Sequence, residues 1–200
     1  MRRYPHALTR AATVTAVAAI VAAGLPAVGA TAAIPKPKPS CLLIVDPVGD
    51  ARTGDTDIRS GDVASGTATI GGVLRLRSLV PEAASLTAAR WDLSFTVREV
   101  VYTFGLRRDA GGVVTPTFAR RTPGGTAGTV AGVTVTYDVA RSEISWRVPR
   151  TAVPELPATP AGEPLYDLTA VTYVTPLDIG SDVALGGSYP DGNPSCLRVA

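Results

Sequence analysis

The sequence predicts an all-β fold, an antiparallel β-sandwich of about nine short strands. Three observations carry this prediction. Apolar and polar residues alternate in several segments, which is the pattern of a strand with one buried face. Turn-forming residues separate these segments, and helical periodicity is nearly absent, with room for one short turn over 81–89.

The individual strands are predicted from alternation and from β-branched residues. In 91–98 the odd positions are apolar and the even ones polar, whereas 100–106 alternates in the opposite phase. A tight turn or a bulge at Arg98-Glu99 explains this change of phase. In chain order, the predicted strands are 41–45, 63–70, 73–79, 91–98, 100–106, 113–120, 133–139, 144–148 and 165–174.

The connections follow from turn chemistry. Gly71-Gly72 predicts a two-residue hairpin turn, and 109–112 and 140–142 fit short hairpin loops. Pro123-Gly124-Gly125 marks a further break. The segment 149–164 contains five prolines and cannot lie inside a sheet. We expect it to cross the surface and to join the two sheets.

Residues 1–32 have the composition of a secretory signal peptide. The first ten residues hold three arginines and no acid, 11–30 carries no charge, and Ala30-Thr31-Ala32 offers the small residues that a signal peptidase recognises. A membrane anchor is the alternative, but Gly24 and Pro26 interrupt the apolar stretch. We therefore expect a secreted protein without a stable membrane anchor.

After the signal peptide, 33–40 forms a Pro-rich spacer and 41–200 forms the sandwich domain. From Ala33 onward, 16 Lys and Arg stand against 17 Asp and Glu, so the net charge is −1. A chain with this balance has little electrostatic attraction for nucleic acid. We expect a monomer.

The composition leaves few residues for catalysis. The single His and the single Met, His6 and Met1, leave with the signal peptide, and both lysines lie in the spacer. Neither a Ser-His-Asp nor a Cys-His arrangement can then be built, and Ser-Lys and Schiff-base chemistry are excluded from the folded region. We expect no catalysis. A carboxylate-based glycoside hydrolase, which needs only two acids, is the enzymatic alternative.

Two cysteines, Cys41 and Cys196, stand near the two ends of the domain. In an exported protein we expect them to form a disulfide, and two separate free thiols are the alternative. The bond requires the first and last strands to be neighbours.

Clustered aspartates after the first strand make the best metal-site candidate. Calcium takes about six to eight oxygen ligands from carboxylates, backbone carbonyls and water. We expect Asp46, Asp50 and Asp57 to be ligands of a structural Ca²⁺. In the alternative reading, these acids cap their own turn or pair with Arg52 and Arg59.

Exposed aromatic rings are candidates for sugar binding, because an aromatic face fits the apolar face of a pyranose. Trp91 and Trp146 occupy the apolar phase of strands and are expected in the core. Tyr166 and Tyr173 lie on a strand that is apolar on both faces, and Tyr189 lies in a Gly-rich loop. These three tyrosines are the predicted ligand-binding residues.

Several short motifs resemble those of a known group of domains. They are Asp-Pro-Val-Gly-Asp-Ala at 46–51 followed by Asp57-Ile58, the alternating strand 91–97 followed by Tyr102, and Ile-x-Trp-x-Val-Pro-Arg at 144–150. Together they resemble β-sandwich domains of secreted actinobacterial proteins, often appended to subtilisin-like proteases. Those domains are similar to carbohydrate-binding family 9 and DOMON-like sandwiches. The resemblance implies a sandwich that binds sugar, haem or calcium. Haem binding is not carried over, because the mature chain lacks His and Met.

We therefore expect a secreted, non-catalytic binding module, stabilised by calcium, with an extracellular polysaccharide as first ligand class and a protein as second. A structural or protein-interaction protein of the cell envelope is the alternative. An aromatic row on one sheet face would favour sugar. A long uncharged sheet edge would favour a protein partner.

Overall fold

A computed structural model describes residues 43–81, 88–130, 132–175, 179–187 and 189–190 of the chain. In this part all regular secondary structure is β-strand, apart from the short 3-10 helix Arg150–Ala152. The predicted all-β class is confirmed. No helix within the described ranges has the length and apolarity needed to cross a membrane. The predicted signal peptide, the spacer, most of the segment 81–89 that is predicted to hold a short turn, and both cysteines lie outside these ranges.

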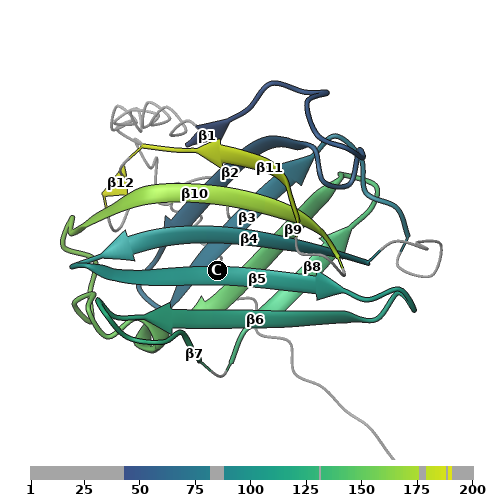
Figure 1. Cartoon of the computed structure of the whole chain (residues 1–200). Coiled ribbons are helices and arrows are strands. Elements are labelled where there is room, and N and C mark those ends of the chain that lie inside the picture. The colour runs from purple at the N-terminus through teal and green to yellow at the C-terminus, as the bar shows by residue number, and fades with distance from the viewer. Residues whose placement is uncertain (1–42, 82–87, 131, 176–178, 188, 191–200) are drawn as a thin grey trace, which may run out of the picture. The chain divides into compact units, whose positions relative to one another are not determined.

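The strands form two antiparallel sheets (Figure 1). The smaller sheet has the order β1 (Ile44–Val45), β2 (Ile58–Ser65), β3 (Thr69–Leu76), β9 (Glu143–Pro149), β8 (Thr134–Asp138). The larger sheet has the order β11 (Ile179–Leu185), β10 (Pro164–Thr175), β4 (Ala88–Val97), β5 (Val100–Arg108), β6 (Val114–Arg121), β7 (Gly128–Thr129). The short β12 (Tyr189–Pro190) pairs with β10.

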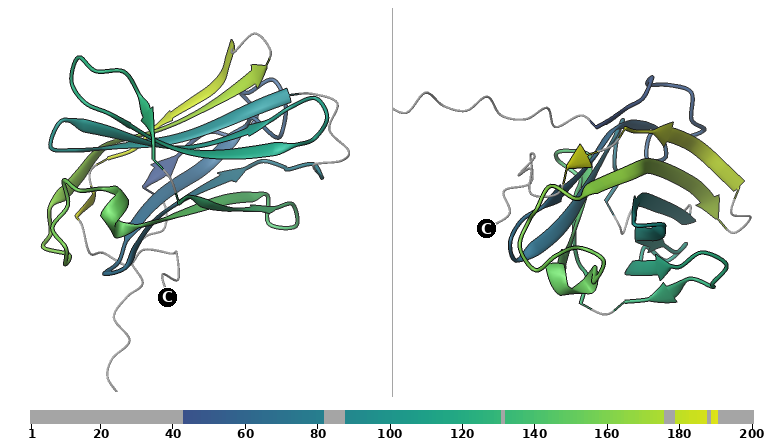
Figure 2. Two further views of the ribbon diagram at one scale, coloured as in Figure 1. Left: turned by 90° about the horizontal axis from the view of Figure 1, so that it is seen from below. Right: turned by 90° about the vertical axis from the view of Figure 1, so that its left-hand side faces the viewer.

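The two sheets pack face to face, with the larger one curved over the smaller one (Figure 2). The apolar phases predicted for the strands meet between them, and Trp91 and Phe95 of β4 are fully buried. Phe104 of β5 stacks on Trp146 of β9 with 6.1 Å between the ring centroids. The Trp146 indole N–H also donates to the Gly105 carbonyl across the sheets, at 3.0 Å. The predicted core positions of both tryptophans are confirmed.

Most predicted connections are confirmed. Arg98 and Glu99, with φ of +46° and +70°, form the two-residue turn between β4 and β5, as the change of phase requires. The Pro-rich segment after Pro149 leads from the smaller sheet to the larger one. Its Val153 and Leu156 are buried, so the crossover also covers one end of the core.

The predicted hairpin turn at Gly71-Gly72 is wrong. Both glycines lie within β3, and the connection between β2 and β3 is at 66–68, so the two strands are shifted relative to the prediction. A Cβ on Gly72 would lie 2.8 Å from atoms of both Leu93 and Phe104. The glycine therefore allows the larger sheet to pack closely on β3, which is a tertiary requirement and not a turn signal.

The predicted set of nine strands omits β7, β11 and β12. Strand β11 reads Ile-Gly-Ser-Asp-Val-Ala-Leu, and its Gly and Asp are residues that strands generally avoid. It forms because β10 offers a long partner edge. Tyr189, predicted in a loop, contributes its backbone to β12.

Candidate functional site

The two sheets meet along one side of the sandwich, where β1 approaches the chain that follows β11. An antiparallel bridge joins Ile44 of β1 to Gly186, and the Ile44 side chain is fully buried. The start and the end of the described domain therefore lie side by side (Figure 1). The predicted disulfide between Cys41 and Cys196 requires this proximity, but both cysteines lie outside the described ranges and the bond stays a prediction.

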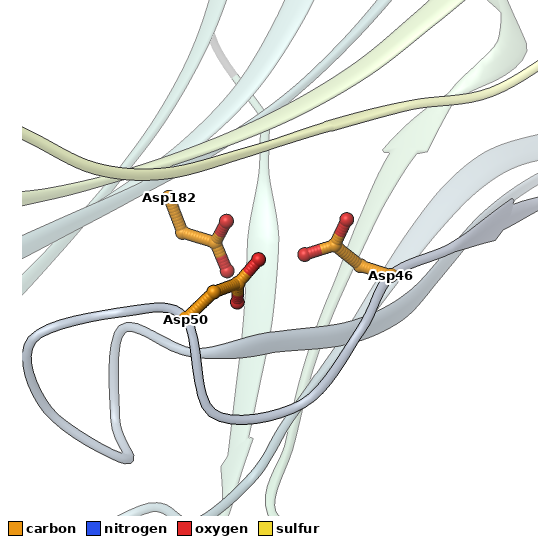
Figure 3. A group of neighbouring side chains, drawn as sticks. All are labelled: Asp46, Asp50 and Asp182. Atoms are coloured by element: carbon orange, nitrogen blue, oxygen red, sulfur yellow. The ribbon is translucent and has the colours of Figure 1, made fainter.

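We call the region where β1 and β11 meet the seam. Three aspartate side chains gather there (Figure 3). Asp46 directly follows β1, Asp50 lies in the loop that continues from it, and Asp182 lies on β11. One carboxylate oxygen from each lies within 4.8 Å of the other two. The Asp182 carboxylate is held by the backbone, since it accepts the N–H of Ile58 at 2.7 Å and that of Val183 at 2.8 Å. We call Asp46, Asp50 and Asp182 the acidic trio.

Asp57, the third predicted calcium ligand, is not part of the acidic trio. It is fully buried, accepts the Gly49 N–H at 2.8 Å and lies 3.6 Å from the Arg77 guanidinium. Gly49 has a φ of +105°, a conformation that glycine adopts without strain, and this turns its N–H toward Asp57. Asp57 therefore orders the loop that carries Asp46 and Asp50.

Asp182 was missed by the sequence prediction. It stands more than a hundred residues from the other two acids of the trio, in a strand that the sequence pattern does not reveal. The usable signal was the expected Cys41–Cys196 bond. If the chain ends are neighbours, an acid in the last part of the chain can face the loop that follows the first strand.

Burial and neighbouring negative charges raise the pKa values of two of the three aspartates. Burial, followed by the negative charges of Asp182 and Asp50, raises the pKa of Asp46 to about 6. Burial also raises the pKa of Asp182, against the lowering effect of its backbone hydrogen bonds. In the described part of the chain no arginine forms an ion pair with the acidic trio, so Arg52 and Arg59 do not neutralise it.

A cation suits this arrangement. One oxygen of Asp46, Oδ2, is buried and has no hydrogen-bond partner among the described residues. Calcium takes oxygen ligands from carboxylates, backbone carbonyls and water in flexible geometry. The acidic trio could hold the Ca²⁺ that the sequence predicts, with Asp182 in the place that the sequence prediction gives to Asp57.

Calcium is expected to stabilise the folded protein, because the ion finds its ligands together only in the native state. At a calcium concentration about 100-fold above Kd the gain is about 2.7 kcal/mol. Thermal unfolding of the purified protein with calcium or with EDTA measures it. Asp182→Asn is expected to lose most of the calcium-induced rise in Tm, and Asp109→Asn, on a distant hairpin, is expected to keep it. An equal Tm with calcium and with EDTA would contradict the site.

In EDTA, Asp46 is expected to make the protein less stable as the pH rises from about 4 to about 6. The folded state keeps the Asp46 proton up to about pH 6, whereas a free aspartate loses it near 3.8. The folded state thus binds more protons in this window, and raising the pH favours unfolding. Asp46→Asn is expected to be more stable than the wild type above pH 6. Urea unfolding at a series of pH values measures the difference between the two proteins. A difference in unfolding free energy that stays constant with pH would contradict the raised pKa of Asp46.

A second candidate site lies on the outer face of the larger sheet. The even positions of β4 point away from the core, and Tyr166 and Tyr173 of β10 pair with two of them, Thr96 and Arg90. Directly paired residues lie on the same face of a sheet, so both tyrosines belong to this outer face, where they are half-buried. Trp91 points the other way and is fully buried.

The two tyrosines are fixed by different contacts. The Tyr166 hydroxyl accepts the Glu99 N–H in the β4–β5 turn, at 2.9 Å. The Arg90 guanidinium lies 5.1 Å from the centre of the Tyr173 ring, in a cation–π arrangement. The side chain of Tyr189 lies outside the described part of the chain.

A groove of about 320 Å³ lies beside Tyr173 on this face, over β10, β4, β5 and β6. A hollow of about 250 Å³ shares Arg90, Asp92 and Thr117 with it. Gly105 keeps the hollow open, because a Cβ there would lie 2.4 Å from the Thr117 hydroxyl and 3.3 Å from Asp92. We call these two connected hollows the outer groove.

The floor of the outer groove is made of small polar side chains. Ser94 and Thr103, opposite each other on β4 and β5, join their hydroxyls at 2.8 Å. Arg90 bonds Asp92 along β4, with 3.1 Å from Nε to the carboxylate. Tyr173 is the residue of this groove that the sequence predicts to bind a ligand. The others looked like the solvated face of an ordinary strand, since residue types alone do not show which sheet face is hollow.

No family model matches the chain, and no curated protein matches it significantly.

Proposed function

We propose that this protein is a secreted, non-catalytic binding module that holds an extracellular polysaccharide in the outer groove. The observation that carries the proposal is the combination on one sheet face of two half-buried tyrosines, Tyr166 and Tyr173, with a floor of small hydroxyl side chains. Saccharides present apolar ring faces and many hydroxyl groups. An aromatic side chain beside hydrogen-bonding groups matches both.

The size of the floor residues supports an elongated ligand. Rows of paired residues run across β10, β4, β5 and β6, and the row of Tyr173 is three rows from that of Tyr166. Paired positions on one face are two residues apart, so this distance is about 20 Å at a rise of about 3.4 Å per residue. The rows between them carry Gly105, Ser94 and Thr103, which leave room for a chain of sugars.

The carboxylates support a non-catalytic role. Glycoside hydrolysis uses two carboxyl groups that flank the bond. Among the described side chains that line the outer groove, Asp92 is the one carboxylate, and it is bonded to Arg90. Apart from Glu99, each described glutamate forms an ion pair: Glu143 with Arg75, Glu155 with Arg120, and Glu163 with Arg98.

The acidic trio fits an extracellular setting. Calcium sites of extracellular modules work at about 0.1–1 mM calcium, concentrations that are sustained outside the cell. An ion at the seam would fasten β1 to β11, the strand next to β10. Calcium would then stabilise the sheet that carries the outer groove, without touching the ligand.

Binding to insoluble and soluble polysaccharides tests the proposal. The purified protein is expected to bind at least one member of a panel of cellulose, chitin, xylan and peptidoglycan. Tyr173→Ala is expected to weaken that binding about tenfold, because aromatic anchors dominate such contacts. Val113→Ala, an exposed apolar position on the β5–β6 hairpin, is the matched control and is expected to bind like the wild type. An absence of binding to every polysaccharide tested, charged or neutral, or equal binding by Tyr173→Ala, would refute the proposal.

A protein ligand is the second candidate, and one observation favours it. Within the described chain β8 is the edge of the smaller sheet, and its Thr134, Val135, Thr136 and Tyr137 carry no charge. Such an edge can pair with a strand of a partner. Thr136→Lys, at an exposed position of this edge strand, would block the pairing without placing a charge against the core. A partner lost with Thr136→Lys but retained with Tyr173→Ala would favour this function over polysaccharide binding.

A further inference from the structure

We infer that the outer groove selects an anionic polysaccharide, one that carries carboxylate, sulfate or phosphate groups along its chain. The inference rests on the proposed function and names the chemical class of its ligand. It starts from the charges that the described residues place around the groove, which are three arginines and one aspartate: Arg90, Arg107, Arg121 and Asp92.

The arrangement of two of these arginines is unfavourable in the protein alone. Arg90 on β4 and Arg107 on β5 are directly paired, and both belong to the outer face. Like charges in directly opposed positions destabilise a sheet. Asp92 offsets Arg90, since its two carboxylate oxygens bond the Arg90 guanidinium. Arg107 is exposed and forms no ion pair with any residue that the structure describes.

Arg121 adds a further uncompensated charge. It is exposed, lies on β6 opposite Val101 and lines the same groove as Arg90. Glu99 lies with Arg121 around a neighbouring hollow, but no ion pair joins the two side chains. The groove therefore has an excess of positive charge, although the mature chain from Ala33 is expected to be slightly negative.

The neighbouring arginines show that this excess belongs to one face. Arg108 and Arg120 stand next to Arg107 and Arg121 in the sequence, but alternation turns them to the other side of the sheet. There, Arg108 pairs with Asp55 and Arg120 with Glu155. The inward arginines thus have carboxylate partners, and the two outward ones have none in the described chain. An anionic ligand would supply them.

Guanidinium groups suit such a ligand. Their planar forks match carboxylate, sulfate and phosphate oxygens with two parallel hydrogen bonds. Tyr173 lies beside Arg90 in the same row, so a sugar ring on the tyrosine brings its acidic substituent within reach of the arginines. The ligand class that fits both features is an acidic glycan.

The test compares polymers that differ in charge. The purified protein is titrated with polygalacturonate, dextran sulfate, polyphosphate and neutral dextran, at about 0.05 M and about 0.5 M salt. We expect at least one of the two charged glycans to bind more than about tenfold tighter than dextran at low salt, and this preference to shrink at high salt. The polyphosphate arm shows whether phosphate alone is sufficient without sugar.

Two substitutions make the test specific. Arg107→Gln is expected to weaken binding of the charged glycan about tenfold and to leave binding of neutral glycans unchanged. Arg141→Gln is the control. It removes an exposed arginine on the β8–β9 turn of the other sheet, and this variant is expected to bind like the wild type. Thermal unfolding checks that both variants are folded. Arg107→Gln relieves the repulsion with Arg90 and is expected to melt no lower than the wild type.

Each outcome decides the inference. Equal binding of dextran and the charged glycans overturns the inference and leaves polysaccharide binding standing. Equal binding of polyphosphate and the charged glycans, both weakened by Arg107→Gln, shows a general anion-binding face and also overturns it. If the uncharged cellulose or chitin of the first panel binds and the charged glycans do not, the inference fails alone. If no glycan of either panel binds, the proposed function fails with it.

Discussion

Replacing Arg108 with alanine is expected to destabilise the protein by about 3–5 kcal/mol, because the change leaves a buried carboxylate without its partner. The Arg108 side chain is completely buried, and its Nη2 donates to Asp55 Oδ2 at 2.7 Å. Its Nη1 donates to the Tyr137 hydroxyl at 2.9 Å, and its guanidinium lies 5.1 Å from the centre of the Trp91 ring. One side chain therefore connects β5 to β4, to β8 and to the loop before β2.

The effect of Arg108→Ala reaches the seam as well. Asp55 belongs to the same loop as Asp46 and Asp50, and its backbone carbonyl accepts the Trp91 indole N–H at 2.6 Å. An unpaired Asp55 would move toward solvent and pull this loop from the sheet. We therefore expect Arg108→Ala to lose part of its calcium-induced rise in Tm in addition to its stability.

Urea unfolding measures the expected loss. Arg107→Ala is the matched control, since it removes the same side chain from the neighbouring residue on the outer face, and it is expected to stay within about 0.5 kcal/mol of the wild type. The double variant Arg108→Met, Asp55→Leu is expected to recover most of the loss, because it replaces the ion pair by apolar groups. A single variant as stable as the wild type would show that the buried pair contributes little.

Replacing Gly72 with valine is expected to destabilise the protein by about 3 kcal/mol, at the upper end of the range for overpacked cores. Its Cβ would lie 2.8 Å from a methyl group of Leu93 and 2.8 Å from the Phe104 ring, both in the facing sheet. Neither side chain can move far, because Phe104 packs on Trp146 and on Phe118. The two sheets would have to separate locally.

A graded series makes this prediction specific. Gly72→Ala is expected to destabilise less than Gly72→Val, since it adds one methyl group to the same contact. Gly128→Val is the control, because Gly128 also lies in a strand but has nothing within 4 Å of a Cβ. Chemical unfolding of the three variants gives the series. Equal stability of Gly72→Val and Gly128→Val would show that the close approach of the sheets is not required.

These two residues illustrate what the sequence could and could not predict. The sequence pattern predicts Gly72 in a turn, because a Gly-Gly pair between β-branched segments is a local hairpin signal. Its actual role depends on Leu93 and Phe104, which reach it only through the packing of the sheets. Arg108 follows Arg107 in the sequence, and its residue type does not mark it as buried. The alternation of β5 was visible, but the buried carboxylate that receives Arg108 was not.

The candidate sites divide in the same way. The sequence predicts Asp46 and Asp50 as ligands, because acids at a turn near glycines offer oxygens in any fold. Asp182 lies beside them because the chain that follows β11 pairs with β1, which brings the two ends of the described domain together. Tyr173 was singled out as an aromatic residue, but the register of β10 against β4 decides that it faces Arg90.

The sequence by itself determined the fold class, the inward phase of β4 and β5, the turn at Arg98-Glu99 and the crossover between the sheets. All of these depend on neighbours a few residues away, where alternation, left-handed turns and proline act directly. The tertiary structure alone decided the acidic trio, the buried Arg108–Asp55 pair, the place of Gly72 and the charged outer groove. Each of these needs the order and register of strands that are distant in sequence. That order is set by the packing energy of the whole sandwich, which no local pattern of residues contains.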